Sequence, residues 1–246
     1  MTGKFRVDNH LTLNLLDLPQ EELLQFIIHN FEDGNLNQSY IALHVSFFLN
    51  LSNPEYIKSL RKSYLYADGM SVVLAAKFQN FERIGRSATT DLGPLLLAEL
   101  SEISIAPIRI GIIGGDEVLI NNTASYFTNK CGAHILFALN GYPDTWTTDQ
   151  HSQITSEVDV VFIGMGVPSE QIFLEEIRDK LDSKIILTCG GLFGFLTGNE
   201  NRAPKIMQNI GAEWFWRLLQ SPRRLAGRYF VGFIKFIKFI YRIRMQ

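Results

Sequence analysis

Long apolar runs without polar alternation mark the second half of the chain, from about residue 108 to residue 198. Three units there repeat one plan, in which an apolar run leads into a glycine-containing turn and then a helical segment. They read IRIGIIGGDEVLINNTASYF, VDVVFIGMGVPSEQIFLEEIRDKL and SKIILTCGGLFGFLTG. Runs of Ile, Val and Leu of this kind are typical of strands that are buried on both faces. The pattern predicts an α/β fold, Rossmann-like, with a mostly parallel sheet and helices on both faces.

The first half of the chain fits the same plan less regularly. The segment SYIALHVSFF, residues 39–48, predicts a strand that runs into a short helix, and residues 53–61 continue as a helix. A strand-like run at 64–66 gives way to apolar residues at helix spacing from residue 70 to 78. A polar loop then precedes a helix that we expect to start near Asp91.

The candidate chemistry gathers at the carboxyl ends of the predicted strands, where ligands of open parallel sheets bind. Asp68 follows one strand and has Gly69 directly behind it, so its carboxylate is either a helix N-cap or a functional group. The glycine turns would offer backbone amides to an anionic ligand such as a diphosphate, although tight turns alone also require glycine. None of them is a GxGxxG dinucleotide motif, which argues against an NAD-dependent enzyme. The turn residues at this edge are Gly114, Gly115, Gly166, Pro168, Gly190 and Gly191.

The composition narrows the class of protein. With 246 residues, 46% hydrophobic and 12% aromatic, the chain can form one large domain, or a domain with an appendage. Two cysteines outside any CxxC pair indicate a reduced, cytoplasmic compartment. The five histidines lack metal-ligand spacing, so no metal site is expected. Charges near the N-terminus argue against a signal peptide, and no apolar run is long enough to span a bilayer.

Charge is divided unevenly along the chain. Residues 202–246 carry ten Lys or Arg and one acid, so this segment has a charge of about +9 and the rest about −11. We therefore expect an α/β catalytic domain over residues 1–200 and a basic amphipathic appendage over 201–246. Phe and Ile surround its basic stripe, which favours an anionic membrane surface over nucleic acid. Packing of this helix against the body or a second subunit is the alternative. The stripe consists of Arg224, Arg228, Lys235, Lys238 and Arg242.

Four stretches resemble the WecG/TagA/CpsF family of bacterial glycosyltransferases: ADGMSVV, GMGVPSEQ, CGGLFGFLTGNENRAPK and GAEWFWRLLQSPRRLAGRY. They follow the family's order from about residue 40 to residue 230. The resemblance implies inverting transfer of a sugar from a UDP-sugar donor to a polyprenyl-diphosphate-linked acceptor, with no metal or other cofactor required. It places the protein on the inner face of the cell membrane, in the synthesis of teichoic acid, capsule or exopolysaccharide.

The resemblance also implies roles for single residues. Asp68 would be the general base that takes the proton of the acceptor hydroxyl. His44, near the position of a family active-site Thr, is either a catalytic or donor contact or a core histidine. Phe193 would stack against the uracil beside the paired glycines. Glu170 and Gln171 would bind ribose or sugar hydroxyls, unless they form a solvated helix start.

Two further groups of residues have competing interpretations. Thr90 and Asp91 are either an N-cap with an acid in the first turn or part of the acceptor side of the site. Four arginines either form a solvated basic face or hold the donor's diphosphate in place of a metal: Arg202, Arg217, Arg224 and Arg228.

The chain departs from the family at Ser169-Glu170-Gln171, at Gly194 and at His44. A catalytically inactive sugar-nucleotide-binding or scaffolding subunit of a polysaccharide assembly complex is therefore the alternative function. The sequence leaves a homo-oligomer open.

Overall fold

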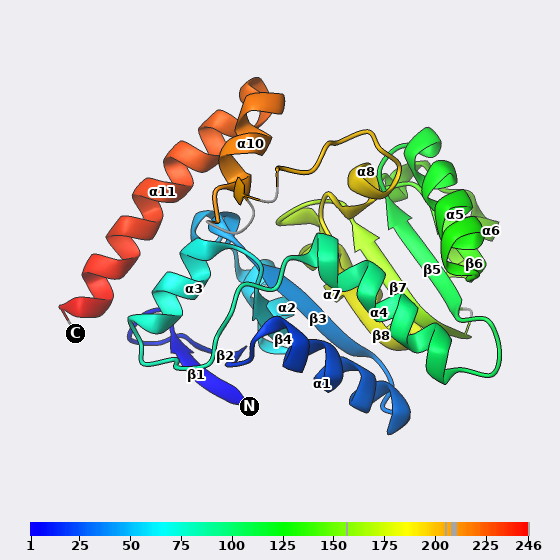
Figure 1. Cartoon of the computed structure of the whole chain (residues 1–246), viewed down its shortest axis with the longest axis horizontal. Coiled ribbons are helices and arrows are strands. Elements are labelled where there is room, and N and C mark those ends of the chain that lie inside the picture. The colour runs from blue at the N-terminus through cyan, green and yellow to red at the C-terminus, as the bar shows by residue number, and fades with distance from the viewer. Residues whose placement is uncertain (156, 205, 208–210, 246) are drawn as a thin grey trace.

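A single eight-stranded sheet forms the centre of the protein (Figure 1). The computed structural model describes residues 1–155, 157–204, 206–207 and 211–245. The strand order is β1-β2-β4-β3-β8-β7-β5-β6, and every neighbouring pair is parallel except the antiparallel hairpin β1–β2. The strands are β1 (Thr2–Arg6), β2 (Thr12–Leu16), β3 (Gln38–Leu43), β4 (Tyr64–Ala67), β5 (Arg109–Gly114), β6 (His134–Leu139), β7 (Glu157–Gly164) and β8 (Asp182–Thr188).

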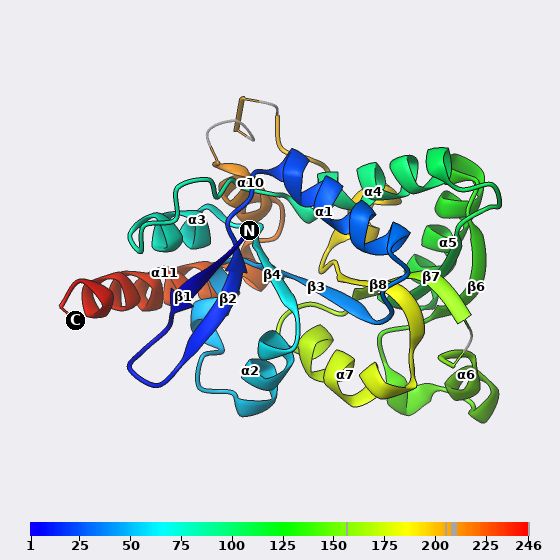
Figure 2. The same cartoon turned by 90° about the horizontal axis from the view of Figure 1, so that it is seen from below.

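Helices cover both faces of the sheet (Figure 2). One face packs under α1 (Gln20–Glu32), α4 (Thr89–Ile103), α5 (Glu117–Cys131) and α8 (Leu192–Leu196). The other packs against α2 (Pro54–Arg61), α3 (Met70–Lys77), α7 (Ser169–Ile177) and the 3-10 turn η1 (Val45–Leu49). The remaining elements are α6 (Thr148–Gln153), α10 (Glu213–Gln220), α11 (Pro222–Arg244) and the 3-10 turns η2 (Pro143–Thr145) and η3 (Arg178–Lys180).

The helices on both faces of the sheet explain why the apolar runs do not alternate with polar residues. Along β7, Val160 and Phe162 belong to the core under α4 and α5, whereas Val161 and Ile163 belong to the core on the α7 side. All four are 0% exposed, so both faces of the strand are apolar along this stretch. The predicted parallel sheet with helices on both faces is confirmed. The helix expected near Asp91 begins at Thr89, and the β1–β2 hairpin was not predicted.

The C-terminal helix α11 packs across the turn η1. Phe236, Phe239 and Ile243 are buried in the same core as η1 and the hairpin β1–β2. Lys235 Nζ donates to the Leu49 carbonyl at 3.2 Å, and Arg242 donates to the Val7 carbonyl at 2.7 Å. The division of the chain into a catalytic domain and an appendage at residue 200 stays a prediction. The buried side of α11 packs into the core of the larger domain. Within the described ranges, no helix has the length and apolarity needed to cross a membrane.

Candidate active site

Asp68 and His44 lie side by side at the carboxyl edge of the sheet. Leu43 of β3 is in register with Ala67 of β4, so the next residue of each strand comes to the same edge. The amides of Asp68 and Gly69 both donate to the Leu43 carbonyl at 3.0 Å. The two strand ends thus bring residues 44 and 68 to the same edge of the sheet, where ligands of parallel sheets bind.

Gly69 allows this close approach. A Cβ at residue 69 would lie 2.9 Å from both Cα and Cβ of His44, closer than real Cβ atoms pack. Any side chain there would push the end of β3 away from the end of β4. The glycine behind Asp68 is therefore a packing requirement of the paired strand ends.

The Asp68 side chain does not cap the helix that follows it. The N-cap of α3 is Gly69, without a side-chain hydrogen bond, so the predicted cap on this helix is wrong. Asp68 Oδ1 instead accepts from the Thr89 amide at 3.3 Å, at the first residue of α4. Burial raises the pKa of the Asp68 carboxyl, and Arg217 and Arg86 oppose that rise. A partly buried carboxylate with a raised pKa is suited to accept a proton.

His44 is neutral and oriented by the backbone. Its Nδ1 accepts from the Ser46 amide at 3.3 Å, so the proton of the neutral ring sits on Nε2. Burial, with Arg228 and Arg217, lowers the pKa of His44 to about 4. With its Nδ1 lone pair engaged, His44 presents an N–H donor and is a poor candidate for a general base. This arrangement favours the interpretation that His44 contacts the sugar donor over the one in which it abstracts a proton.

An ion pair joins the C-terminal segment to the strand end that carries Asp68. Arg86 Nε donates to the Asp68 carbonyl at 3.0 Å, and its Nη2 donates to Glu213 Oε2 at 2.5 Å. Glu213, at the start of α10, is only 3% exposed and also lies 3.8 Å from Arg217 Nη2. Sequence reasoning missed both Arg86 and Glu213. The available signal was that Glu213 is the one acid among ten basic residues in 202–246.

The predicted arginines converge near Asp68 to different degrees. Arg217 opposes the rise in the Asp68 pKa and lies with its guanidinium 4.5 Å above the Phe195 ring. Arg228 acts with Arg217 on His44. The side chain of Arg224 lies outside the described residues. Burial also raises the pKa of Tyr229, and Arg217 and Arg228 oppose that rise.

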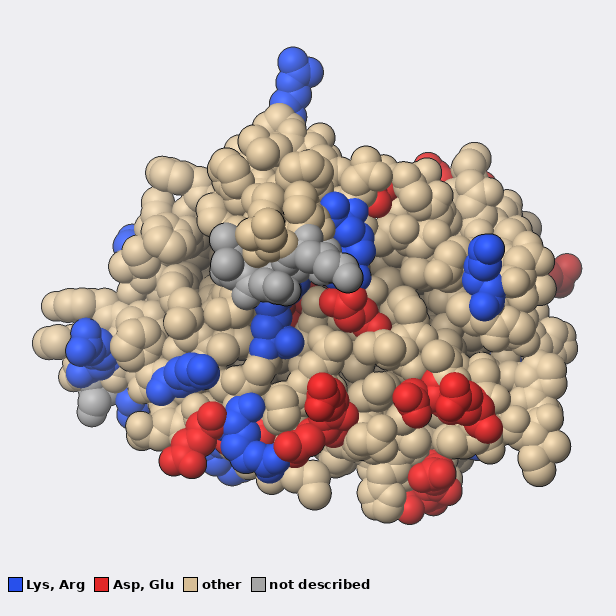
Figure 3. Space-filling model, in the orientation of Figure 1, with Lys and Arg blue, Asp and Glu red and all other residues tan. Residues whose placement is uncertain are grey.

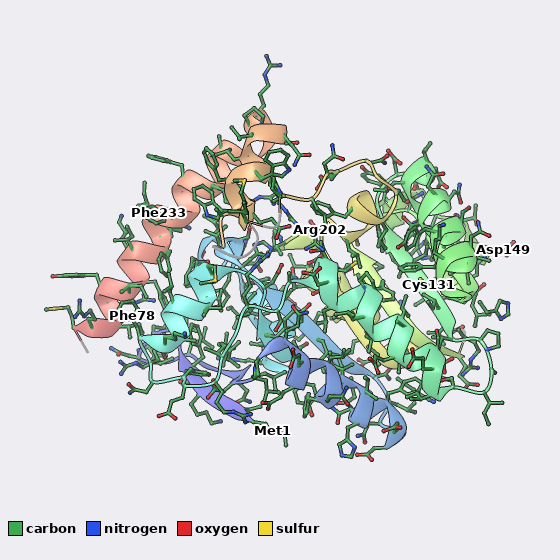
Figure 4. The ribbon with its side chains drawn as sticks, in the orientation of Figure 1. Met1, Phe78, Cys131, Asp149, Arg202 and Phe233 are labelled. Atoms are coloured by element: carbon green, nitrogen blue, oxygen red, sulfur yellow. The ribbon has the colours of Figure 1, made fainter. Side chains whose placement is uncertain are left out.

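Thr90 and Asp91 do not form the predicted N-cap. The N-cap of α4 is Ala88, with no side-chain hydrogen bond, and Thr90 Oγ1 is buried with no partner among the described residues. Asp91 does lie in the first turn, where it binds Arg202 through both carboxylate oxygens. In Figure 4, Arg202 lies near the middle of the view, between the sheet and the C-terminal helices. The pair ties the segment after α8 to the start of α4.

Glu170 and Gln171 form a buried clamp instead of a solvated helix start. They are 2% and 0% exposed, so that alternative is wrong. Glu170 Oε2 accepts from the amides of Gly166 at 2.9 Å and Gly190 at 3.1 Å, and Oε1 accepts from Gln171 Nε2 at 3.0 Å. Despite these bonds, burial raises the pKa of Glu170 to about 7. The carboxyl fixes the turn after β7 to the turn after β8.

This clamp changes the predicted use of the glycine turns. The amides of Gly166 and Gly190 already donate to Glu170, so they are not free for a diphosphate. Gly114 serves packing, because a Cβ there would lie 2.3 Å from the Gly164 carbonyl oxygen. Phe193 is 1% exposed within the core, which counts against its predicted contact with uracil. Nucleotide-binding roles for Gly115, Pro168 and Gly191 stay predictions.

Comparison with known proteins identifies the family. The model described as "Glycosyl transferase WecG/TagA/CpsF family" matches residues 9–246, nearly the whole chain. The match includes the strand ends that carry His44 and Asp68 and the C-terminal helices. It confirms the resemblance that the four sequence stretches indicated.

Proposed function

The chain belongs to the WecG/TagA/CpsF family of glycosyl transferases, and we propose that it is an inverting enzyme that uses a UDP-sugar. The family supports a role in cell-surface polysaccharide synthesis. In the proposed reaction, the acceptor is a polyprenyl-diphosphate-linked glycan and no metal is required. The observation that carries this proposal is Asp68 at the carboxyl edge of the sheet, where burial raises the pKa of its carboxyl and Arg217 and Arg86 oppose that rise.

The proposed mechanism uses Asp68 as the base. Its carboxylate takes the proton of the acceptor hydroxyl while that oxygen attacks the anomeric carbon, and UDP leaves from the opposite face. The Nε2–H of His44 donates a hydrogen bond to a donor hydroxyl or phosphate oxygen. Arg217 and Arg228 supply positive charge for the developing diphosphate, since guanidinium groups bind such oxygens strongly. Arg202 and Arg86, which each donate a hydrogen bond to a carboxylate, mainly position the surrounding elements.

We further propose that the protein works on the cytoplasmic face of the membrane, held there by α10 and α11. The outer side of these helices is apolar: Trp214, Phe215, Leu219, Phe230, Phe233, Ile237 and Tyr241 are each at least 44% exposed. In Figure 3, the region that α10 and α11 occupy in Figure 1 shows basic and uncharged atoms and no acidic ones. Such a surface suits the interface of an anionic membrane, where a lipid-linked acceptor presents its diphosphate.

An Asp68→Asn variant tests the proposed reaction. Asn keeps the shape and the hydrogen bond to the Thr89 amide but cannot take a proton. UDP release with polyprenyl-diphosphate sugar acceptors should fall by at least about a hundredfold, the low end for a general base. UDP binding and the thermal midpoint should change little. Near-normal turnover would refute the assignment, and wild-type protein that binds UDP-sugars without turning them over would favour the inactive-subunit alternative.

A further inference from the structure

Helix α3, which begins two residues after Asp68, has an apolar outer face. Met70, Leu74 and Phe78 at its C-cap, spaced at i, i+4 and i+8, are 37%, 44% and 51% exposed. We call these three residues the α3 stripe. The opposite side of the helix is buried against the body through Val72, Val73, Ala75 and Ala76. A surface helix normally has polar residues on its outer side, whereas α3 and its C-cap expose these three apolar residues and one charged residue, Lys77.

The α3 stripe lies beside the C-terminal helices. At one end, a Cβ on Gly211, just before α10, would lie 2.6 Å from Met70 Cγ. At the other end, the Arg244 guanidinium of α11 lies 5.9 Å from the centre of the Phe78 ring. Figures 1 and 2 both show α3 next to α11, and Figure 4 shows Phe78 and Phe233 on the same side of the molecule. The exposed apolar residues of α3 therefore continue those of α10 and α11.

The exposed charges on the three helices of this surface are of one sign. On α3, α10 and α11 the exposed charged side chains that the structure describes are all basic, and Lys77 lies within α3 itself. The acid Glu213 is buried against Arg86. A second copy of the chain placed on this face would bring basic residues against the same basic residues. An anionic lipid surface complements both the charge and the apolar side chains.

We propose that the α3 stripe inserts into the headgroup region of an anionic membrane and forms a second membrane contact beside α11. This inference rests on the membrane association proposed above. The contact orients the active site, because Phe78 is ten residues from Asp68, a span of about 15 Å along a helix. The bilayer then fixes the distance from the carboxylate to the headgroup level through α3 as well as through the C-terminal segment.

Vesicle cosedimentation of the full chain tests this contact. The vesicles contain phosphatidylglycerol and phosphatidylcholine. A double variant, Leu74→Asp with Phe78→Asp, should bind at least about tenfold more weakly, because it loses two apolar side chains that would insert into the membrane and adds two negative charges. The matched control is Ile105→Asp with Val118→Asp. Ile105 and Val118 are also exposed, at 108% and 68%, but lie outside α3, α10 and α11, and their change should leave binding within about twofold of wild type.

Different outcomes separate the two proposals. If wild type does not bind the vesicles, membrane association itself is wrong. If wild type binds and the α3 double variant binds equally well, only the α3 contact is wrong. A Leu74→Ser, Phe78→Ser variant repeats the test without added charge, and unchanged circular dichroism keeps misfolding from explaining a loss. Light scattering that shows a wild-type dimer, broken by the α3 variant with lipid binding intact, would assign the stripe to a second copy and overturn the proposal.

Discussion

A Glu170→Gln variant should lose a pH dependence of stability that the native carboxyl imposes. Burial raises the pKa of Glu170 from 4.5 to about 7, so the folded protein holds this proton more tightly than the unfolded chain does. The resulting stabilisation is fully present below the unfolded pKa and is lost as the pH rises through the folded pKa. At about 1.4 kcal/mol per pKa unit, the difference amounts to about 3 kcal/mol.

The clamp tolerates glutamine at residue 170. Oε1 of the new amide can accept from Gly166 and Gly190, in the place of the carboxylate oxygen. Its Nε2 needs an acceptor, and Gln171 Oε1 is buried with no partner among the described residues. A flip of the Gln171 amide supplies that acceptor. The variant should therefore fold. Its unfolding free energy should lack the pH-dependent contribution of a carboxyl at residue 170.

Nearby groups do not obscure the measurement. The charge of Glu170 acts on three nearby groups, Tyr56, Tyr66 and Cys189. Burial raises the pKa of each of them well above the pH range of the measurement, so they stay neutral. Urea unfolding of wild type and variant is compared from pH 4.5 to pH 8. This range runs from the ordinary pKa of Glu170 to about one unit above its pKa in the folded protein. Glu176→Gln, an exposed change on the same helix, is the control.

The difference in unfolding free energy between wild type and Glu170→Gln should fall by about 3 kcal/mol over this range. The corresponding difference for Glu176→Gln should stay constant. A difference for Glu170→Gln that does not vary with pH would show that the carboxyl titrates normally, and the argument from burial would fail.

Three further changes test other parts of the site. Gly69→Ala should lower the unfolding free energy by about 1–3 kcal/mol and reduce turnover, because the added Cβ would push against His44. Wild-type values in urea unfolding and in UDP release would contradict this packing argument. Activity should persist in excess EDTA if arginines carry the diphosphate charge, whereas complete loss restored by magnesium would refute it. Replacing exposed Arg223 and Lys238 with Glu should weaken binding to anionic vesicles by about tenfold or more, as high salt should, and unchanged cosedimentation would count against α11 as a membrane contact.

The sheet and the position of Asp68 could be predicted because both depend on local sequence. A strand buried on both faces must be apolar at successive residues, and the four residues from Val160 to Ile163 show this. The turn after such a strand lies at the carboxyl edge whatever the rest of the fold does. Asp68 with Gly69 could therefore be placed, although the partner that requires glycine, His44, became apparent only from the structure.

The clamp and the ion pair could not be predicted, because their partners are far apart in the sequence. Glu170 binds the amide of Gly190, and Arg86 binds Glu213 across 127 residues. Locally, Pro168 followed by polar residues has the pattern of an exposed helix start, which is why a solvated helix start was the alternative to sugar binding for Glu170 and Gln171. Only the packing of the turns after β7 and β8 encloses them. Long-range contacts of this kind need the tertiary arrangement.

The ion pair also changes how the C-terminal segment is understood. The charge division suggested a catalytic body and a separate membrane arm, yet Arg217 of α10 opposes the rise in the Asp68 pKa, and Arg228 of α11 acts on His44. If α10 moved away, Asp68 would lose a positive neighbour and its pKa would rise further, leaving less of the ionised base at neutral pH. The helices proposed to bind the membrane therefore also set the protonation of the proposed base. Glu213 holds α10 to Arg86 and so to the strand end that carries Asp68, and this contact would couple the proposed docking to the proposed chemistry.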